Sequence, residues 1–292
     1  MRKLTTKLLF AIISAAFALV ALGTTTFAWF TLSDTAQVSQ FNAQITAGEG
    51  IEISLDDETY YTTIPASVIQ GKITELNVSL KDVTSTDGKT FKYFGAQSPI
   101  VYDTETKNPY IEFDLYVRSP EANAKIALND YTFSSIDGET SGTKWTADAD
   151  FISSFGGPVE AGYEGTYYAH AALRMSLTPV NGGSEGVAQV YQAPGVDNVN
   201  KVISTEPIPQ GMVSYYKAKN GENSINISDV TIADALTSAS STEIITLSST
   251  PNEASVIRVR VWIEGWDPDC FNAILNSKIN VSFGLKKVVD QG

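Results

Sequence analysis

The chain has 292 residues, with 33 acidic and 20 basic side chains and a formal net charge of −13 at pH 7. An acidic surface of this size repels nucleic acid and anionic bilayers, so we expect neither as a partner. The single cysteine, Cys270, cannot form a disulfide within one chain, so the fold must be stabilised by packing and sheet pairing.

The first 28 residues have the order of features that defines a secretory signal peptide. They begin with three basic residues, Arg2, Lys3 and Lys7. An apolar run over residues 8–22 follows, and Thr26 and Ala28 place small side chains at the positions that a signal peptidase reads. We therefore expect cleavage between Ala28 and Trp29, and a protein that is secreted or held at the cell surface. The alternative is an uncleaved membrane anchor, since ~20 apolar residues span a bilayer.

Several segments alternate apolar and polar residues with a period of two, which predicts strands buried on one face. The longest are residues 110–119, 167–177, 255–265 and 277–287, and shorter ones are residues 50–55 and 75–80. In residues 255–265 we expect the alternate polar and aromatic side chains to face out: Arg258, Arg260, Trp262 and Glu264. Strands of this kind are typical of antiparallel sheets packed face to face.

Together these segments predict an all-β fold, an antiparallel β-sandwich of jelly-roll type with short helices, forming one domain over residues 29–292. Regions rich in Gly, Ser, Asn and Pro near residues 134–165 and 181–224 are expected to be insertions, either surface loops or an inserted layer of hairpins. Three short helices or helical turns are also expected, at residues 148–155, 228–236 and 269–275.

The chain offers few candidates for catalysis. Its only histidine, His170, falls inside a predicted strand, where we expect an exposed side chain and not part of a nucleophile–base pair. Zinc-protease, Cys/His-cluster and phosphate-loop motifs do not occur in the sequence, so neither a catalytic residue nor a cofactor is expected. A hydrolase stays open as an alternative, because the paired carboxylates of a glycosidase have no fixed spacing in sequence.

Three carboxylates gather in the segment EGWDPDC: Glu264, Asp267 and Asp269. Carboxylate and carbonyl oxygens are the ligands that Ca²⁺ takes, so one hypothesis is a calcium loop. The hypothesis that we favour is an ordinary turn, in which Asp269 caps the following helix and the charges face water. On that interpretation the segment binds no metal.

Aromatic residues allow a further interpretation, a carbohydrate-binding adhesin. The candidate platforms for sugar rings are Trp145, Trp262 and Trp266, in a chain that also has 13 tyrosines. Aromatic residues are equally ordinary constituents of β-sheets, so their number does not by itself decide between a binding surface and a core.

An aromatic-containing junction, an Asp-containing turn, a strand and a small-residue step follow one another at residues 27–30, 33–34, 41–46 and 47–48. This order resembles the N-terminal region of the TasA/camelysin family of exported Gram-positive proteins, which carry a SipW-type signal peptide. Residues 255–286 are similar to the closing segment of secreted proteins with the same leader. The resemblance implies a jelly-roll subunit of extracellular matrix fibres, as in a biofilm, whose leader a dedicated signal peptidase removes. Camelysins are described as peptidases, but this chain has no recognisable peptidase motif.

In the fibre-forming relatives, the strand freed by cleavage completes the sheet of the next subunit. Here Phe41, Ala43 and Ile45 share one strand face, and Val38 joins them if a bulge shifts the register. The resemblance therefore implies a secreted, non-enzymatic structural protein that forms a head-to-tail homopolymer through this donor strand. The alternative is that the segment folds into its own sheet as an ordinary first strand.

Overall fold

The computed structural model describes residues 41–93, 98–102, 107–135, 143–152, 157–167, 169–193, 210–226, 228, 230–267, 270 and 279–288. The expected signal peptide, its cleavage site between Ala28 and Trp29, and Val38 lie outside these residues. Within them, no helix is both long and apolar enough to cross a membrane.

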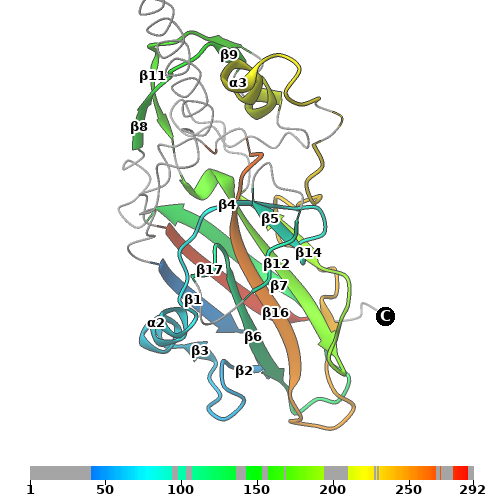
Figure 1. Cartoon of the computed structure of the whole chain (residues 1–292). Coiled ribbons are helices and arrows are strands. Elements are labelled where there is room, and N and C mark those ends of the chain that lie inside the picture. Colours follow the sequence, from blue (N-terminus) through cyan, green and yellow to red (C-terminus); the bar gives the residue numbers. More distant parts are fainter. Residues whose placement is uncertain are drawn as a thin grey trace, which may run out of the picture.

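In the described part of the chain, five strands form one sheet in the order β15–β7–β17–β1–β3 (Figure 1). These strands are β15 (Ile245–Thr246), β7 (Lys125–Ser135), β17 (Ile279–Lys287), β1 (Phe41–Ala47) and β3 (Thr63–Ile64). β17 is antiparallel to β7 but parallel to β1, so the last long strand lies beside the first. A parallel pair needs a long connection, and here nearly the whole described chain supplies it.

The second sheet is built around β12 (Leu173–Asn181) and β16 (Ser255–Glu264), which are antiparallel neighbours. β6 (Ile111–Arg118) pairs with most of β16. β4 (Asp82–Ser85) pairs in parallel with the last two residues of β16. Short strands complete the edges: β2 (Glu52–Ser54), β5 (Phe91–Tyr93), β13 (Ser184–Glu185) and β14 (Gln189–Gln192). Both sheets are therefore mixed, and the prediction of purely antiparallel sheets is wrong at these two parallel pairs.

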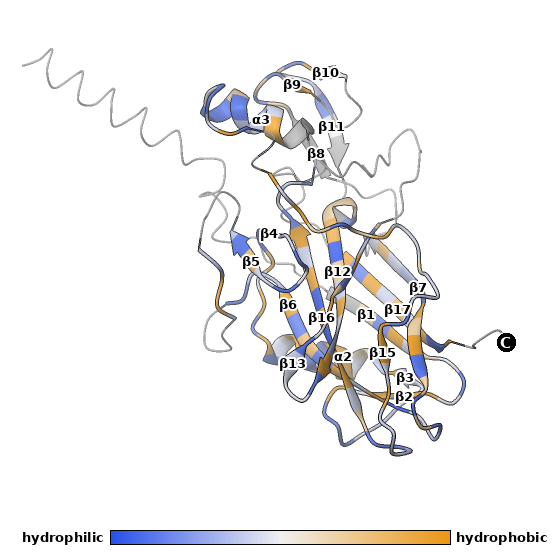
Figure 2. Cartoon of the chain, turned by 90° about the vertical axis from the view of Figure 1, so that its right-hand side faces the viewer, coloured by the Kyte–Doolittle hydropathy of each residue, from blue (hydrophilic) through white to orange (hydrophobic). Residues whose placement is uncertain are grey.

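The two sheets share one hydrophobic core. Leu128 of β7 and Phe283 of β17 belong to the same buried cluster as Leu115 of β6, Met175 of β12 and Val259 of β16. Apolar and polar residues alternate along the long strands (Figure 2), and alternate residues of β6 are buried while those between them are half-buried. The period-two prediction of a mostly β fold is confirmed. Each fully buried aliphatic or aromatic side chain of such a core contributes roughly 1.5–3 kcal/mol.

Both helices of the described chain lie where none was predicted, and the helix predicted at residues 269–275 lies outside the described residues except for Cys270. α2 (Ala66–Glu75) follows Pro65, and α3 (Gln210–Asn220) lies in the second predicted insertion. Residues 230–236 are not helical, because Leu236 pairs through its backbone with Val190 and Gln192 beside β14, and this tertiary pairing overrides the local helix signal. The segment predicted as helical turns at 148–155 instead contains β9 (Phe151–Ile152).

A small end module stands beyond one end of the two sheets (Figures 1 and 2). It contains α3 and the hairpins of β8 (Thr143–Thr146) with β11 (Glu164–Tyr167) and of β9 with β10 (Pro158–Val159). Its own buried cluster comprises Ala147, Phe151, Val213, Tyr215, Val230 and Trp266. Trp266 lies two residues after the end of β16, so the described part of the predicted insertion at 134–165 packs against a residue that is anchored to the main sheet.

Candidate functional site

β1 is the element to which the sequence assigns a role in assembly. It pairs with β17 over its whole length, from Phe41 opposite Ile279 to Ala47 opposite Leu285. Ile45 is fully buried, and Ala43 packs partly buried against the same core. Ala43 and Ile45 therefore lie on one face of the strand, against the core, while the side chain of Phe41 lies outside what the structure describes. A role of this face between subunits stays a prediction. In this single chain the strand occupies its own sheet, the alternative arrangement stated above.

β1 is held very unequally on its two sides. β17 pairs with all seven of its residues, whereas β3 pairs only with Ile45 and Thr46. Gly284 of β17 allows the close approach, because a Cβ there would lie 2.9 Å from Oγ1 of Thr46 and 2.7 Å from Oδ1 of Asp130. β17 thus supplies most of the strand pairing of β1, and α2 also packs against it. The backbone groups on the other side of its first residues face no strand in the described chain.

The carboxylates of Glu264 and Asp267 are buried, so the prediction that the charges of the acidic turn face water is wrong for these two residues. Glu264 is 1% exposed and accepts hydrogen bonds from Nε1 of Trp262 at 3.1 Å and from the backbone N–H of Trp266 at 3.2 Å. Asp267 is fully buried and accepts a hydrogen bond from Nη2 of Arg174 at 2.6 Å. Burial raises the pKa of Glu264 above its ordinary value, because desolvation outweighs these donors.

The same bonds bear on the calcium hypothesis. The carboxylates of Glu264 and Asp267 are directed to protein donors, and Asp269 lies outside the described residues. Among the residues that the structure describes, no three His, Cys, Asp or Glu side chains are grouped so as to hold a metal ion. The arrangement instead ties β12 to the turn that follows β16.

The outward face of β16 is covered, which corrects a second prediction. Arg260 and Trp262 are 4% and 0% exposed, although the alternation is as predicted. A further layer packs on this face, in which Phe91 contacts Trp262 edge-on with ring centroids 5.1 Å apart. Arg260 is neutralised by Glu112 and Glu185. Alternation with a period of two predicts which residues share a face of a strand. It does not predict whether water or another layer of the protein covers the polar face.

Burial also removes two of the three candidate sugar platforms. Trp262 is fully buried and Trp266 is 6% exposed, so neither ring can stack on a sugar. The side chain of Trp145 lies outside the described set. The large aromatic residues with substantial exposure in the described chain are Tyr163 and Tyr93.

His170 also differs from its prediction. It lies in the 3-10 helix η1 (Ala169–Ala172), not in a strand, and it is buried with 5% exposure. Burial lowers its pKa, which favours the neutral imidazole. Burial of the neutral imidazole costs less free energy than burial of the charged form. The buried position of His170 agrees with a structural role.

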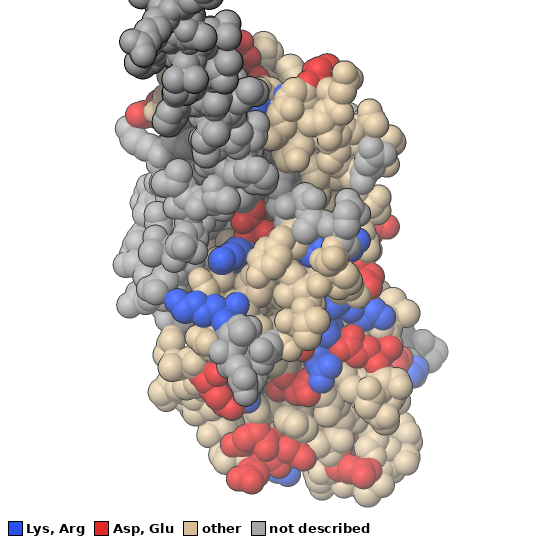
Figure 3. All heavy atoms as spheres, in the orientation of Figure 1, with Lys and Arg blue, Asp and Glu red and all other residues tan. Residues whose placement is uncertain are grey.

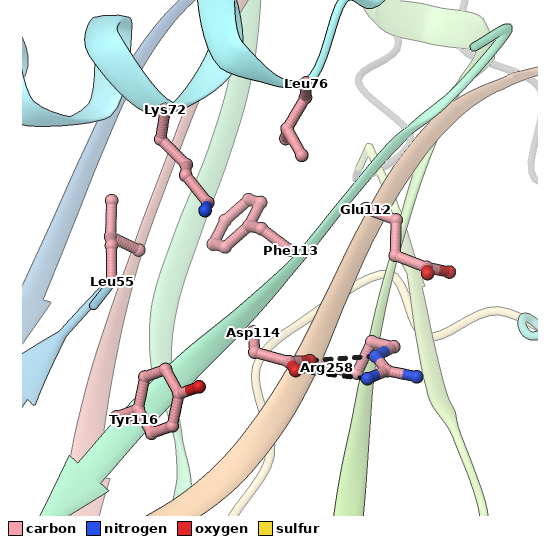
Figure 4. Close-up of a pocket in the computed structure, with 8 residues that line it drawn as sticks. All are labelled: Leu55, Lys72, Leu76, Glu112, Phe113, Asp114, Tyr116 and Arg258. Carbon is pink, nitrogen blue, oxygen red and sulfur yellow. Dashed lines mark hydrogen bonds and ion pairs between the residues drawn. The ribbon is translucent and has the colours of Figure 1, made fainter. Parts of the chain in front are cut away.

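A pocket of about 210 Å³ opens beside β6 (Figure 4). Lys72 of α2 and Leu76, which follows the end of that helix, point toward Phe113. Asp114 binds Arg258 through two hydrogen bonds of 2.8 and 3.1 Å. Its other lining residues are Leu55, Glu112 and Tyr116. Each charged group here already has a partner, since Lys72 pairs with Glu75 and Glu112 with Arg260, so the pocket presents paired charges to a ligand.

Comparison with known protein families, with curated proteins and with solved structures finds no match for this chain. The function must therefore be argued from the strands and contacts described above.

Proposed function

We propose that the protein is a secreted, non-enzymatic structural subunit of an extracellular surface or matrix fibre, and that subunits assemble by sharing β1. The observation that carries the proposal is the pairing of β1. It is the first described strand and it pairs in parallel with the last long described strand over seven residues, whereas β3 pairs with only two of its residues; α2 also packs against β1. A strand held in this way can be supplied by a second copy without a change of contacts.

The energy of exchange follows from the same contacts. Donation of β1 loses and regains identical hydrogen bonds to β17 and the same burial of Ile45, so the two arrangements differ only in the connecting turn and in association costs. Because each subunit gives a strand at one site and takes one at another, the contact is head-to-tail and propagates as a filament. The partner is thus another copy of this chain.

Export and fold complete the proposal. The leader expected at residues 1–28 supports secretion, with a signal peptidase as the partner that acts before assembly. We propose a jelly-roll type of sandwich for the subunit, which the two facing sheets with one shared core support. An adhesin has less support, because Trp262 and Trp266 are buried.

A disulfide between β1 and β17 tests the proposal. Gln44 and Ser282 are paired in register; Gln44 is exposed and Ser282 half-buried. Paired residues of neighbouring strands lie within the range of Cα distances that a disulfide needs. Oxidation of monomeric Gln44→Cys/Ser282→Cys should lock β1 in its own sheet and abolish assembly, and reduction should restore it.

Oxidation after assembly gives the complementary result. The same two cysteines then belong to neighbouring subunits, so non-reducing electrophoresis should show a ladder of covalent oligomers. The single variants Gln44→Cys and Ser282→Cys are the controls and should show neither effect. A locked monomer that assembles like the parent protein would refute strand sharing.

A further inference from the structure

The connection between β1 and β2 is a tight turn of residues 48–51. The N–H of Ile51 donates to the carbonyl of Gly48 at 3.1 Å, and Gly50 has a φ of +70°. A positive φ at the third position is characteristic of a type II turn and strongly favours glycine there. These four residues carry the chain from the five-stranded sheet to the other sheet.

Two kinds of contact hold this turn. The hydrogen bonds from Ile51 to Gly48 and from Oγ of Ser119 to the carbonyl of Gly50, at 2.8 Å, exist only while the turn is closed. The bond from the N–H of Gly48 to the carbonyl of Leu285, also 2.8 Å, continues the pairing of β1 with β17. It can therefore form again with Leu285 of a second copy.

We infer that the turn at residues 48–51 is the hinge that determines whether β1 stays in its own sheet or is donated to another copy. This inference rests on the strand sharing proposed above. In the closed state the chain reverses at Gly50, whereas in the donated state residues 48–51 are extended. Short hinge turns under strain favour exchange of the element that they connect.

The length of the hinge also limits the geometry of the assembly. Four extended residues span at most ~14 Å, at ~3.3–3.6 Å per residue. The β17 edge of the acceptor must then lie within about this distance of β2 of the donor. Subunits joined by this hinge are in direct contact along the fibre.

Gly50→Val is the decisive variant. A β-branched residue is strained at a positive φ but not in an extended chain, so the change destabilises only the closed turn. The nearest atom to a new Cβ is Nζ of Lys287 at 2.7 Å, the end of a flexible side chain that can move aside although it pairs with Glu121 at 3.0 Å. We expect the β1 amides of the monomer to exchange hydrogen about tenfold faster, and assembly to proceed about tenfold faster.

Gly182→Val is the matched control. Gly182 has a φ of +57° in the turn between β12 and β13, and a Cβ there meets no atom within 4 Å. The substitution introduces the same backbone strain away from β1. It should leave both β1 exchange and assembly at the parent rates, which separates hinge opening from general destabilisation.

Two further variants act on the turn without strain at Gly50. Ser119→Ala removes the hydrogen bond to the Gly50 carbonyl and should accelerate assembly. Insertion of three glycines after Glu49 lengthens the turn, so that β1 stays more readily in its own sheet, and should slow assembly. These opposite signs keep the inference testable if Gly50→Val does not fold.

The outcomes distinguish the hinge from the exchange itself. If the disulfide lock blocks assembly but β1 exchange and assembly are unchanged in Gly50→Val and Ser119→Ala, strand sharing stands and the hinge inference is wrong. If the locked monomer assembles, strand sharing is wrong whatever the hinge variants do.

Discussion

Asp82 begins β4 with 8% of its surface exposed. Burial raises the pKa of its carboxyl to about 7 from an ordinary value of 3.8, and the charge of Lys81 opposes this only in part. Ionisation of a buried carboxyl that has no close cation is unfavourable, because the charge is removed from water. In the unfolded chain water solvates the same charge, so the free-energy cost falls on the native state alone. Glu264, whose pKa burial also raises, adds an effect of the same sign.

The contribution of Asp82 to stability should therefore depend on pH in the direction opposite to that of Asp56, Asp87, Asp148 and Glu185, whose pKa values are lowered. Between the unfolded pKa of 3.8 and the folded pKa of about 7, the Asp82 carboxyl binds more protons in the native state than in the unfolded state. Its contribution to the free energy of unfolding should fall as pH rises through this interval, by up to ~1.4 kcal/mol per pH unit, and level off above it. Urea denaturation of Asp82→Asn should show a flatter profile and a more stable protein at pH 8. An unchanged slope would contradict this assignment.

The buried pair of Arg174 and Asp267 supports a second prediction. Asp267→Ala leaves the Arg174 guanidinium buried and unpaired, which should destabilise the fold by ~3–5 kcal/mol. Asp114→Ala breaks a pair whose partners are about one third exposed and should cost about 1 kcal/mol or less of stability. Thermal melting of the two variants and the parent protein provides the measurement.

Melting of the parent protein with and without chelator tests the calcium hypothesis. A calcium-dependent rise in melting temperature that Asp267→Asn abolishes would restore the metal hypothesis.

At the scale of elements, the long strands could be predicted and their surroundings could not. β6, β16 and β17 follow from period two because one face of each packs in the core. Burial of Trp262 depends on a covering layer from distant residues, including Phe91 and Ala233, which no local pattern encodes. α2 was missed because Ile69 is its one fully buried residue, so its sequence carries a weak helical period.

β1 was predicted as a strand, and the structure places Ala43 and Ile45 on one face of it, against the core of the same chain. Its direction could not be predicted, because alternation is the same for parallel and antiparallel neighbours. The residues around the acidic turn show a similar limit. Their types indicated a turn, but only the fold brings Arg174 of β12 to Asp267.

The strand itself can be tested as a free peptide. A synthetic peptide of residues 31–47 should occupy the β17 edge and cap fibre growth. The same peptide with Ile45→Asp should not, because it would place an unpaired charge where the native side chain is fully buried. Light scattering during assembly gives the growth rate. Equal inhibition by both peptides would exclude the β1 position as the binding site.

At the scale of the whole molecule, net charge opposes association. Loss of three basic residues with the leader would change the net charge from −13 to −16. Acidic side chains recur over the face shown in Figure 3, with basic groups among them. Repulsion between like-charged subunits is screened by salt, since the Debye length falls from ~30 Å at 0.01 M to ~8 Å at 0.15 M.

Assembly should therefore be faster at higher ionic strength. We expect a severalfold increase in growth rate between about 0.01 M and 0.15 M salt, measured on the same protein preparation at constant pH. A rate that falls with salt would mean that attraction between opposite charges drives the contact, which strand sharing through Ile45 and backbone hydrogen bonds does not require.

The parallel alignment of β1 with β17 also determines how the subunit bears load. Phe41, where β1 begins, and Lys287, where β17 ends, lie at opposite ends of the same pair of strands. When the chain is pulled at its two termini, the force acts along both strands in opposite directions. All seven residue pairs are then sheared at once instead of opening one after another. A subunit of this topology resists tension through its first and last strands, and single-molecule pulling from the termini would measure that resistance directly.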